Sequence, residues 1–249
     1  MIKSNQVFER YELKYILTKT EYEEFKKELL NHMKVDKYGI STIQSVYFDT
    51  PDYKLITKSI DNPVFKEKIR LRSYGLATED SPCYLEIKRK AEGLVYKRRI
   101  SLKEEDALNF MNYKVDINDS QIERELKYFR NYYKNLEPSM LIIYERESFY
   151  KENSEVRVTF DFNPRYRTYD LNLHTSLEGI PLNENDEIYM EIKVLNNMPL
   201  WLTEIITKTK VKRGSISKYG EAYKRVKGHT SPALRKGEAA YGKLIQFNI

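Results

Sequence analysis

The chain has little cysteine chemistry available to it, because its 249 residues include a single cysteine. One cysteine excludes an intramolecular disulfide, and Cys83 lies in a strand-like run where a buried, inert thiol is expected. Long apolar runs are also missing. Runs such as Met140–Ile143 fall far short of the ~20 residues that cross a bilayer, and no apolar signal segment follows Met1. These absences predict a soluble protein in a reducing, cytoplasmic compartment.

Histidine and glycine-rich motifs are scarce as well. The three histidines, His32, His174 and His229, are far apart in unlike contexts, which gives little support to a histidine metal site or a Ser/His/Asp triad. A Gly-x-Gly-x-x-Gly fingerprint is absent. Segment 237–244 contains Gly-x4-Gly-Lys, but Leu244 lacks the hydroxyl that holds Mg²⁺ in a phosphate loop. Any phosphate must therefore be held by side chains.

What the chain does have is charge at alternate positions of strand-like segments. Because strand side chains repeat every two residues, segment 64–72 places one set of cations on one face: Lys66, Lys68, Arg70 and Arg72. The opposite face is largely apolar and consists of Phe65, Glu67, Ile69 and Leu71. This pattern fits a strand packed on protein on one side and open to a polyanion on the other. A solvated edge strand, charged to prevent association, is the alternative for this segment alone.

The same pattern recurs along the chain. Similar alternation occurs in segments 8–15, 84–90, 95–101, 144–146, 157–162 and 187–194. Several strands with an apolar back and a Lys/Arg-rich front predict a sheet closed around a charged interior. Crowded like charges repel unless an anion fills the space between them. The balance of 43 Lys+Arg against 37 Asp+Glu is only mildly basic, so the location of the charge matters more than its sum.

The segments between the strands predict an α+β fold with an antiparallel closed β-barrel and flanking helices. Helical spacing indicates a helix over 19–33, two helical stretches within 103–135 and a short helix over 200–207 after Pro199. Segment 163–185 reads as a long connection. We expect one domain over 1–249, with its core at about 7–224 and an undefined tail over 228–249. The aromatic residues Tyr11, Tyr15, Tyr47 and Phe48 are expected in the core.

Taken together, these segments resemble a known family. The resemblance rests on Arg10-Tyr11-Glu12-Leu13-Lys14-Tyr15, Lys68-x-Arg70-x-Arg72, Glu86-Ile87-Lys88, Lys97 with Arg99, Tyr144-x-Arg146, Arg157 with Asp161, Glu191-x-Lys193 and Ser217-Lys218-Tyr219. In their order and spacing they are similar to the VTC domain, the polyphosphate polymerase branch of the CYTH-like triphosphate tunnel metalloenzymes. The resemblance covers about residues 7–224.

The resemblance implies a tunnel that holds a triphosphate or a longer phosphate chain. The implied phosphate-binding residues are Lys14, Lys68, Arg70, Arg72, Lys88, Lys97, Arg99, Arg146, Arg157, Ser217 and Lys218. The implied catalytic residues are Lys14, Arg70, Arg72, Lys88 and Glu191, and the implied ligands of Mn²⁺ or Mg²⁺ are Glu191 and Glu12. Hydrolytic relatives usually open with Glu-x-Glu-x-Lys, whereas this chain has Arg10-x-Glu12-x-Lys14. The missing carboxylate favours the polymerase-like branch.

The expected reaction is transfer of the γ-phosphoryl group of ATP or another nucleoside triphosphate to a growing polyphosphate, which leaves through the tunnel. No nucleic acid is expected as a partner, and the family adds a membrane-protein partner as a further expectation. Two alternatives stay open. The same site can serve a metal-dependent tripolyphosphatase or nucleoside triphosphatase, because both reactions need the same clamp. A non-catalytic module that binds polyphosphate or RNA is the other alternative.

Overall fold

One curved antiparallel sheet organises the part of the chain that the computed structural model describes, namely residues 10–61, 64–91, 94–117, 120–183, 185–195, 197–214 and 216–228. Its strands are β1 (Arg10–Leu17), β2 (Lys34–Asp49), β3 (Phe65–Tyr74), β4 (Cys83–Ala91), β5 (Leu94–Leu102), β6 (Glu137–Tyr150), β7 (Arg157–Arg167), β8 (Ile180–Pro181), β9 (Ile188–Leu195) and β10 (Lys212–Arg213). The helices are α1 (Lys19–Leu29), α2 (Lys54–Ile60), α3 (Glu104–Met111), α4 (Gln121–Tyr133), α5 (Leu200–Thr209) and α6 (Lys218–Val226). The expected α+β class with an antiparallel sheet is confirmed.

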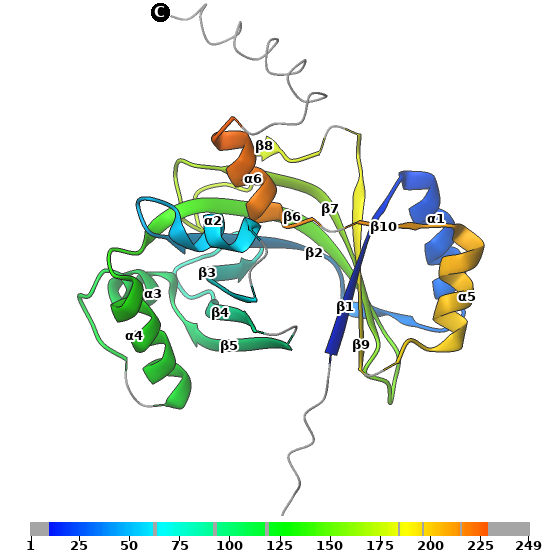
Figure 1. Cartoon of the computed structure of the whole chain (residues 1–249), viewed down its shortest axis with the longest axis horizontal. Coiled ribbons are helices and arrows are strands. Elements are labelled where there is room, and N and C mark those ends of the chain that lie inside the picture. Colours follow the sequence, from blue (N-terminus) through cyan, green and yellow to red (C-terminus); the bar gives the residue numbers. More distant parts are fainter. Residues whose placement is uncertain are drawn as a thin grey trace, which may run out of the picture.

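The sheet folds into two facing halves. Its strand order is β10-β1-β9-β7-β6-β2-β3-β4-β5, and β8 pairs with β7 off this path. We call β3, β4 and β5 the first leaf, and β1, β9 and β7 the second leaf. The long strands β2 and β6 join the two leaves, and α6 lies over the top between them (Figure 1). The inner, concave face therefore receives side chains from both leaves.

The expectation of a closed barrel is wrong in one respect, because hydrogen bonds do not close the sheet. Within the described residues, the ladder ends at β10 and β1 on one side and at β5 on the other. Cations of the two leaves lie near one another on the concave side. Burial lowers the pKa of Lys66 of β3, and so do the charges of Lys90 and Lys88 of β4 and of Lys14 of β1.

The hydrophobic core is divided among the two faces of the sheet. On the outer face, Phe110 of α3 and Phe129 of α4 pack against the first leaf, where Ile69 is fully buried. Also on the outer face, Phe25 of α1 and Leu202 of α5 pack against the second leaf. The concave face has its own cluster, in which α2 and α6 pack on β2 and β6. The apolar backs of the strands thus anchor the cationic fronts.

The helices agree in part with the sequence-based expectations. The expected helix at 19–33 begins as predicted, with a capping box between Thr18 and Glu21, but it ends at Leu29. Region 103–135 contains two helices, α3 and α4, as expected, and the short helix after Pro199 extends to Thr209. Helices α2 and α6 were not predicted. Both are short, and their partners are distant in sequence, so local periodicity carries little signal for them.

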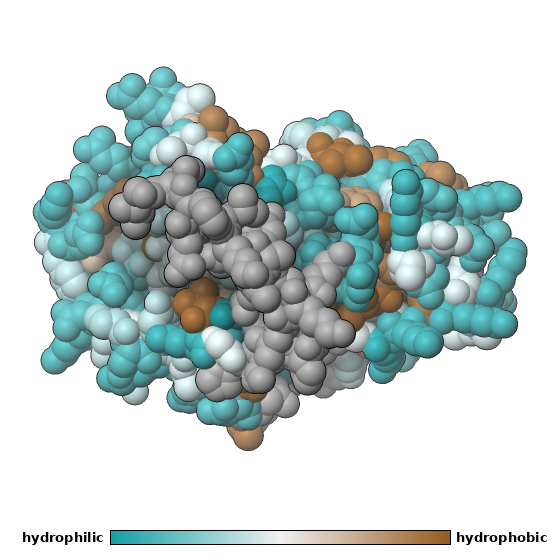
Figure 2. All heavy atoms as spheres, turned by 90° about the horizontal axis from the view of Figure 1, so that it is seen from above, coloured by the Kyte–Doolittle hydropathy of each residue, from teal (hydrophilic) through white to brown (hydrophobic). Residues whose placement is uncertain are grey.

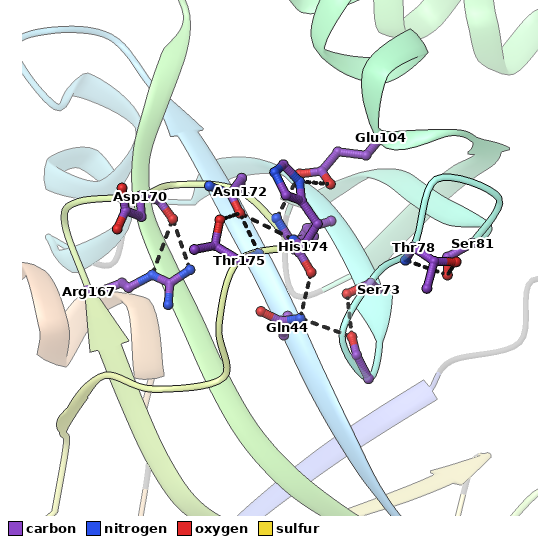
Figure 3. A network of polar contacts seen from close by, with 12 residues as sticks. Gln44, Ser73, Thr78, Ser81, Glu104, Arg167, Asp170, Asn172, His174 and Thr175 are labelled. Atoms are coloured by element: carbon purple, nitrogen blue, oxygen red, sulfur yellow. Dashed lines mark hydrogen bonds and ion pairs between the residues drawn. The ribbon is translucent and has the colours of Figure 1, made fainter.

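The connection between β7 and β8 is tethered by polar contacts, several of which Figure 3 shows. The guanidinium of Arg167 donates to the backbone oxygens of Asp170, Ser176 and Glu178 at 2.9 to 3.3 Å. Gln44 of β2 donates to the oxygen of Leu173, and Glu104 of α3 accepts from the amide of the same residue at 2.7 Å. The expected long connection at 163–185 therefore includes a tethered loop, and β7 extends through its first part to Arg167.

Figure 2, seen from above, shows a largely hydrophilic face with separate hydrophobic patches. Tyr11 is 47% exposed, so its expected core position is wrong, whereas Tyr15, Tyr47 and Phe48 are buried. Among the described residues, no helix combines the length and apolar character needed to cross a membrane. His229 and segment 237–244 lie outside the described residues.

Candidate phosphate-binding site

The strand register brings the predicted cations of the first leaf together. Residues paired across antiparallel strands share a face of the sheet. Arg70 is the partner of Tyr47 on β2 and of Glu86 on β4, while Lys68 pairs with Lys88. Glu86 and Lys88 in turn pair with Arg99 and Lys97 on β5. The alternation seen in the sequence thus becomes one continuous cationic surface on the concave side.

Glu86 is the centre of an ion-pair network in this leaf. Its side chain is 1% exposed and accepts a hydrogen bond from Arg70 Nε at 2.9 Å, while Lys97 Nζ lies 2.6 Å from its other oxygen. Arg72 Nε is 3.8 Å away. Burial alone would raise the pKa of Glu86, but these cations hold it at about 2. Glu86 therefore stays ionised and fixes the guanidinium groups in place.

A cluster of lysines lies next to this network. Burial, reinforced by the charges of Lys14, Lys88 and Lys66, lowers the pKa of Lys68 to about 8. Lys68 Nζ donates to Ser217 Oγ at 3.0 Å, which connects the first leaf with the start of α6. Ammonium groups this close repel one another in the absence of an anion. The cluster is therefore suited to bind a ligand of high negative charge.

The second leaf contributes a carboxylate that pairs with cations of β6 and α6. Asp161 of β7 is 3% exposed and accepts from Arg146 Nε at 2.6 Å and from Arg146 Nη2 at 2.8 Å. Lys218, the first residue of α6, also donates to Asp161. Burial alone would raise the pKa of this carboxyl, but Arg146 and Lys218 lower it. Asp161 thus positions two of the predicted phosphate-binding residues, Arg146 and Lys218, a role that the sequence did not reveal.

The two predicted metal ligands lie together in the second leaf. Glu12 of β1 and Glu191 of β9 are both near Lys193, whose Nζ is 3.9 Å from Glu12 Oε1 and 2.7 Å from Glu191 Oε1. Burial alone would raise the pKa of Glu191, but Lys193 and neighbouring donors lower it. Within the described residues, no group of three or more His, Cys, Asp or Glu side chains is arranged to hold a metal. Two carboxylates do fit a Mg²⁺ or Mn²⁺ that takes its remaining ligands from water and substrate phosphates.

Aromatic rings line the site beside the cations. The Tyr47 hydroxyl accepts a hydrogen bond from Arg70 Nη1 at 2.9 Å, and its ring stacks on Tyr219 of α6 at 4.3 Å between centroids. Burial alone would raise the pKa of Tyr47, but the nearby cations lower it to about 8. Lys218 Nζ lies 4.5 Å from the ring centroid of Tyr144. Tyr47 was expected only as a core residue, and its hydroxyl adds a polar group that the sequence pattern did not show.

Thr159 has an unusual environment on the same face. The residue is 9% exposed, and within the described part of the chain its hydroxyl has no hydrogen-bond partner. Its strand neighbours are Glu191 on β9 and Ser148 on β6. A buried hydroxyl without a partner costs free energy, so the Thr159 hydroxyl is available to pair with a ligand or water.

Cavities distinguish this face from the outer one. A cavity of about 30 Å³ lies between the second leaf and the start of α6 and is lined by residues that include Lys14, Asp161, Glu191 and Lys218. A groove of about 670 Å³ lies on the outer face beside α4 and contains none of the predicted site residues. The chemistry predicted from the sequence therefore gathers on the concave face.

Two predicted residues lie at the margins of the site. Arg99 is exposed on the edge strand β5, where its guanidinium lies 4.8 Å from the ring centroid of Tyr84. Arg157 is exposed at the start of β7 and donates to the backbone oxygens of Ser154 and Val156. The structure therefore brings together Lys14, Lys68, Arg70, Arg72, Lys88, Lys97, Arg146, Ser217 and Lys218, and leaves Arg99 and Arg157 on the rim.

Comparisons with solved structures agree with this fold. A protein from Bacillus halodurans, described as a candidate adenylate cyclase, has 13% sequence identity and a TM-score of 0.53, with 84% of this chain and 95% of that chain covered. A candidate adenylyl cyclase from Hippeastrum, described as having a dominant triphosphatase activity, has 13% identity and a TM-score of 0.50, with 89% and 97% covered. Identity this low shows a shared fold only.

Sequence comparisons identify the family. No curated protein has a significantly similar sequence. The family model of the VTC domain matches residues 9–227, which is most of the 249-residue chain and agrees with the resemblance seen in its motifs. With its strands, its cationic concave face and this match together, the chain belongs to the VTC domain family.

Proposed function

We propose that this protein is a polyphosphate polymerase that binds a nucleoside triphosphate on its concave face and transfers the γ-phosphoryl group to a growing phosphate chain. One observation carries the proposal. Lys68, Arg70, Arg72 and Lys88 face the same space as Arg146 and Lys218, and these six cations share the carboxylates Glu86, Glu12 and Asp161. Such an excess of positive charge matches a condensed phosphate, which carries about one negative charge per phosphate unit.

Arginine and lysine side chains bind phosphate in different ways. Arg70 and Arg72 present planar forks that suit bidentate contact with nonbridging phosphate oxygens, and Glu86 fixes their orientation. Lys14, Lys68 and Lys88 act as point charges along the chain. Positioning of this kind supplies most of the rate enhancement in phosphoryl transfer, because the protein has little covalent chemistry to perform.

A divalent ion fits the second leaf. Glu12 and Glu191 would hold it, together with phosphate oxygens of the substrate, and Lys193 would give up part of its contact with them. When bound, the ion neutralises negative charge on the oxygens between which the phosphoryl group moves.

The carboxylates favour chain growth over hydrolysis. Hydrolysis requires removal of a proton from water, whereas a terminal phosphate oxygen is already an anion. Glu86, Asp161 and Glu191 are held ionised by neighbouring cations, and the pKa of each lies below its ordinary value. Carboxylates this acidic are poor general bases. This supports a phosphate chain as the acceptor.

The product assay tests the proposal. Purified protein is incubated with ATP and Mn²⁺, and the products are separated on a polyacrylamide gel stained for polyphosphate. Long chains that accumulate with ADP are the expected result. Free phosphate as the main product would overturn the proposal and support the hydrolase, an activity for which the Hippeastrum structure is described. Arg72→Ala, which removes a clamp on the concave face, serves as the matched inactive control.

A further inference from the structure

One buried side chain on the concave face has no role in the phosphate clamp. Thr159 of β7 is 9% exposed, and within the described residues its Oγ1 has no hydrogen-bond partner. Its neighbours Val158 and Phe160 are fully buried in the core on the outer face of the second leaf. Because strand side chains alternate between the two faces, Thr159 lies on the concave face, as Asp161 does. The site therefore contains a neutral donor that no described residue uses.

The strand register places this hydroxyl beside one of the two proposed metal ligands. Thr159 pairs with Glu191 of β9, and Glu191 pairs on its other side with Lys14 of β1. The strands β7, β9 and β1 are consecutive in the sheet (Figure 1). Residues paired in this way have Cβ atoms about 4.5 to 5.5 Å apart, a distance that a glutamate side chain spans to reach a threonine hydroxyl. Glu191 thus lies between a neutral donor and a charged one.

In the structure, Glu191 contacts a third donor instead. Lys193, two residues later on the same strand, places its Nζ 2.7 Å from Glu191 Oε1. A divalent ion held by Glu12 and Glu191 would repel this ammonium, so the carboxylate would lose part of that contact. A carboxylate that ligates a metal is oriented by a hydrogen bond from a neighbouring group. Lys14 carries a charge that the ion would also repel, whereas Thr159 adds no charge.

We propose that Thr159 is a positioning residue for the divalent ion. Its hydroxyl donates a hydrogen bond to Glu191 when the ion binds, in place of the contact that Lys193 makes in this structure. Thr159 itself touches neither the ion nor the phosphates, and it acts by keeping the Glu191 carboxylate in the orientation that ligates. The inference rests on the proposed function, because it takes Glu191 as a metal ligand there.

Thr159→Val tests the inference, because it replaces the hydroxyl with a methyl group of similar size. Mn²⁺ alone is titrated into concentrated protein, and the EPR signal of free Mn²⁺ gives its Kd. We expect the Kd of Thr159→Val to rise about tenfold, and that of Thr159→Ser, which keeps the hydroxyl, to stay within about threefold of the wild type. An unchanged Kd in Thr159→Val overturns the inference.

Urea unfolding in EDTA separates positioning from damage to the fold. Thr159→Val should unfold at the same urea concentration as the wild type or at a higher one, because it removes a buried hydroxyl that has no partner among the described residues. Unfolding at a clearly lower concentration would show that the hydroxyl already has a partner, and the inference would then be wrong.

Ser148→Ala is the matched control variant. Ser148 is the register partner of Thr159 on β6, on the side away from Glu191, so loss of its hydroxyl should leave the Kd for Mn²⁺ within about twofold of the wild type. An equal loss of Mn²⁺ affinity in Ser148→Ala and Thr159→Val would contradict a specific role for Thr159.

Binding of tripolyphosphate without metal shows which group the hydroxyl serves. Thr159→Val should bind tripolyphosphate within about threefold of the wild type, because the cations of the clamp are unchanged. A loss of about tenfold would place the hydroxyl on the phosphate, and it would overturn the inference while the polyphosphate site stands.

The outcomes separate this inference from the proposed function. If the wild type makes polyphosphate with Mn²⁺ and Thr159→Val binds Mn²⁺ equally well, the positioning role fails and the proposed function stands. A wild type that makes polyphosphate but binds no Mn²⁺ in the titration also overturns the positioning role. If the wild type neither binds Mn²⁺ nor makes polyphosphate, both fail.

Discussion

The two leaves of the sheet use their cations in different ways. In the first leaf, Glu86 is the single inward-facing carboxylate among a larger set of cations, which are Lys66, Lys68, Arg70, Arg72, Lys88, Lys90, Lys97 and Arg99. In the second leaf, Asp161 holds Arg146 and Lys218, and Glu191 holds Lys193. The first leaf thus carries more inward-facing cations than inward-facing carboxylates, while Arg146, Lys218 and Lys193 each have a carboxylate partner from the second leaf.

This difference indicates a division of function. A local excess of positive charge is unfavourable in the empty protein and becomes favourable when an anion arrives, so the first leaf supplies affinity. Paired charge is already satisfied and holds its geometry, so the second leaf supplies orientation and the carboxylates for a metal. Substitutions in the two leaves should therefore affect different quantities.

The largest expected effect comes from the second leaf. Glu191→Gln should lower kcat by about a thousandfold while the Kd for tripolyphosphate changes by less than about threefold, because it removes a metal ligand and leaves the first leaf intact. Turnover in a manganese titration and binding by calorimetry measure the two quantities. Full activity of Glu191→Gln at low metal would contradict the assignment of this carboxylate.

Glu86→Gln tests the first leaf through stability. It leaves buried cations without their shared partner and should cost about 3 to 5 kcal/mol of unfolding free energy at neutral pH. The folded-state pKa of Glu86, about 2, lies below its ordinary value near 4, so this stabilisation is present above about pH 4 and lost as the pH falls toward 2. Urea unfolding of both proteins at pH 7 and at low pH measures it, and tripolyphosphate should restore more stability to the variant than to the wild type.

Arg70→Ala should weaken tripolyphosphate binding by about 10- to 100-fold, as expected for the loss of a charge-assisted clamp worth about 1.5 to 3 kcal/mol. Lys193→Ala, which removes a cation already paired in the second leaf, is the matched control and should have a much smaller effect. Calorimetric titrations compare them. Equal losses of affinity would remove the distinction between the leaves.

Lys68 should have a smaller, pH-dependent effect on the binding of tripolyphosphate. With its pKa lowered to about 8, it is partly neutral at pH 8.5 in the empty protein, and a bound phosphate chain favours the charged form. Binding should therefore take up a fraction of a proton, and affinity should fall as the pH rises above 8. Calorimetry at pH 8.5 in two buffers of different ionisation enthalpy measures this uptake.

Other groups contribute to the same measurement. Burial lowers the pKa of Lys97 to about 8 despite Glu86, and that of Tyr47 is also about 8. Lys68→Arg, which keeps the charge at all these pH values, should reduce the uptake without abolishing it. An unchanged uptake in this variant would show that Lys68 is not the source.

The smallest effect is expected at the rim. Arg157→Ala should change tripolyphosphate affinity by less than about threefold, because its guanidinium is exposed and engaged with backbone oxygens beside its own strand. A larger loss of affinity, measured by the same titration, would extend the site to the start of β7, where Arg157 lies.

Local patterns made much of this structure predictable. The alternation from Lys66 to Arg72 fixes which side chains share a face, and the Thr18 capping box marks the start of α1. Features that depend on distant contacts were not accessible. The stacking of Tyr47 on Tyr219 joins β2 to α6, and Asp161 meets Lys218 across 57 positions. The Lys88–Glu12 ion pair joins β4 to β1 across 76 positions, which no single segment shows.

The most direct test of the account is a crystal structure with tripolyphosphate and Mn²⁺ bound. The account predicts phosphates on the concave face in contact with Arg70 and Arg72 of the first leaf and with Arg146 and Lys218 beside the second. Tripolyphosphate bound elsewhere, for example in the outer groove beside α4, with these four side chains unengaged, would contradict it.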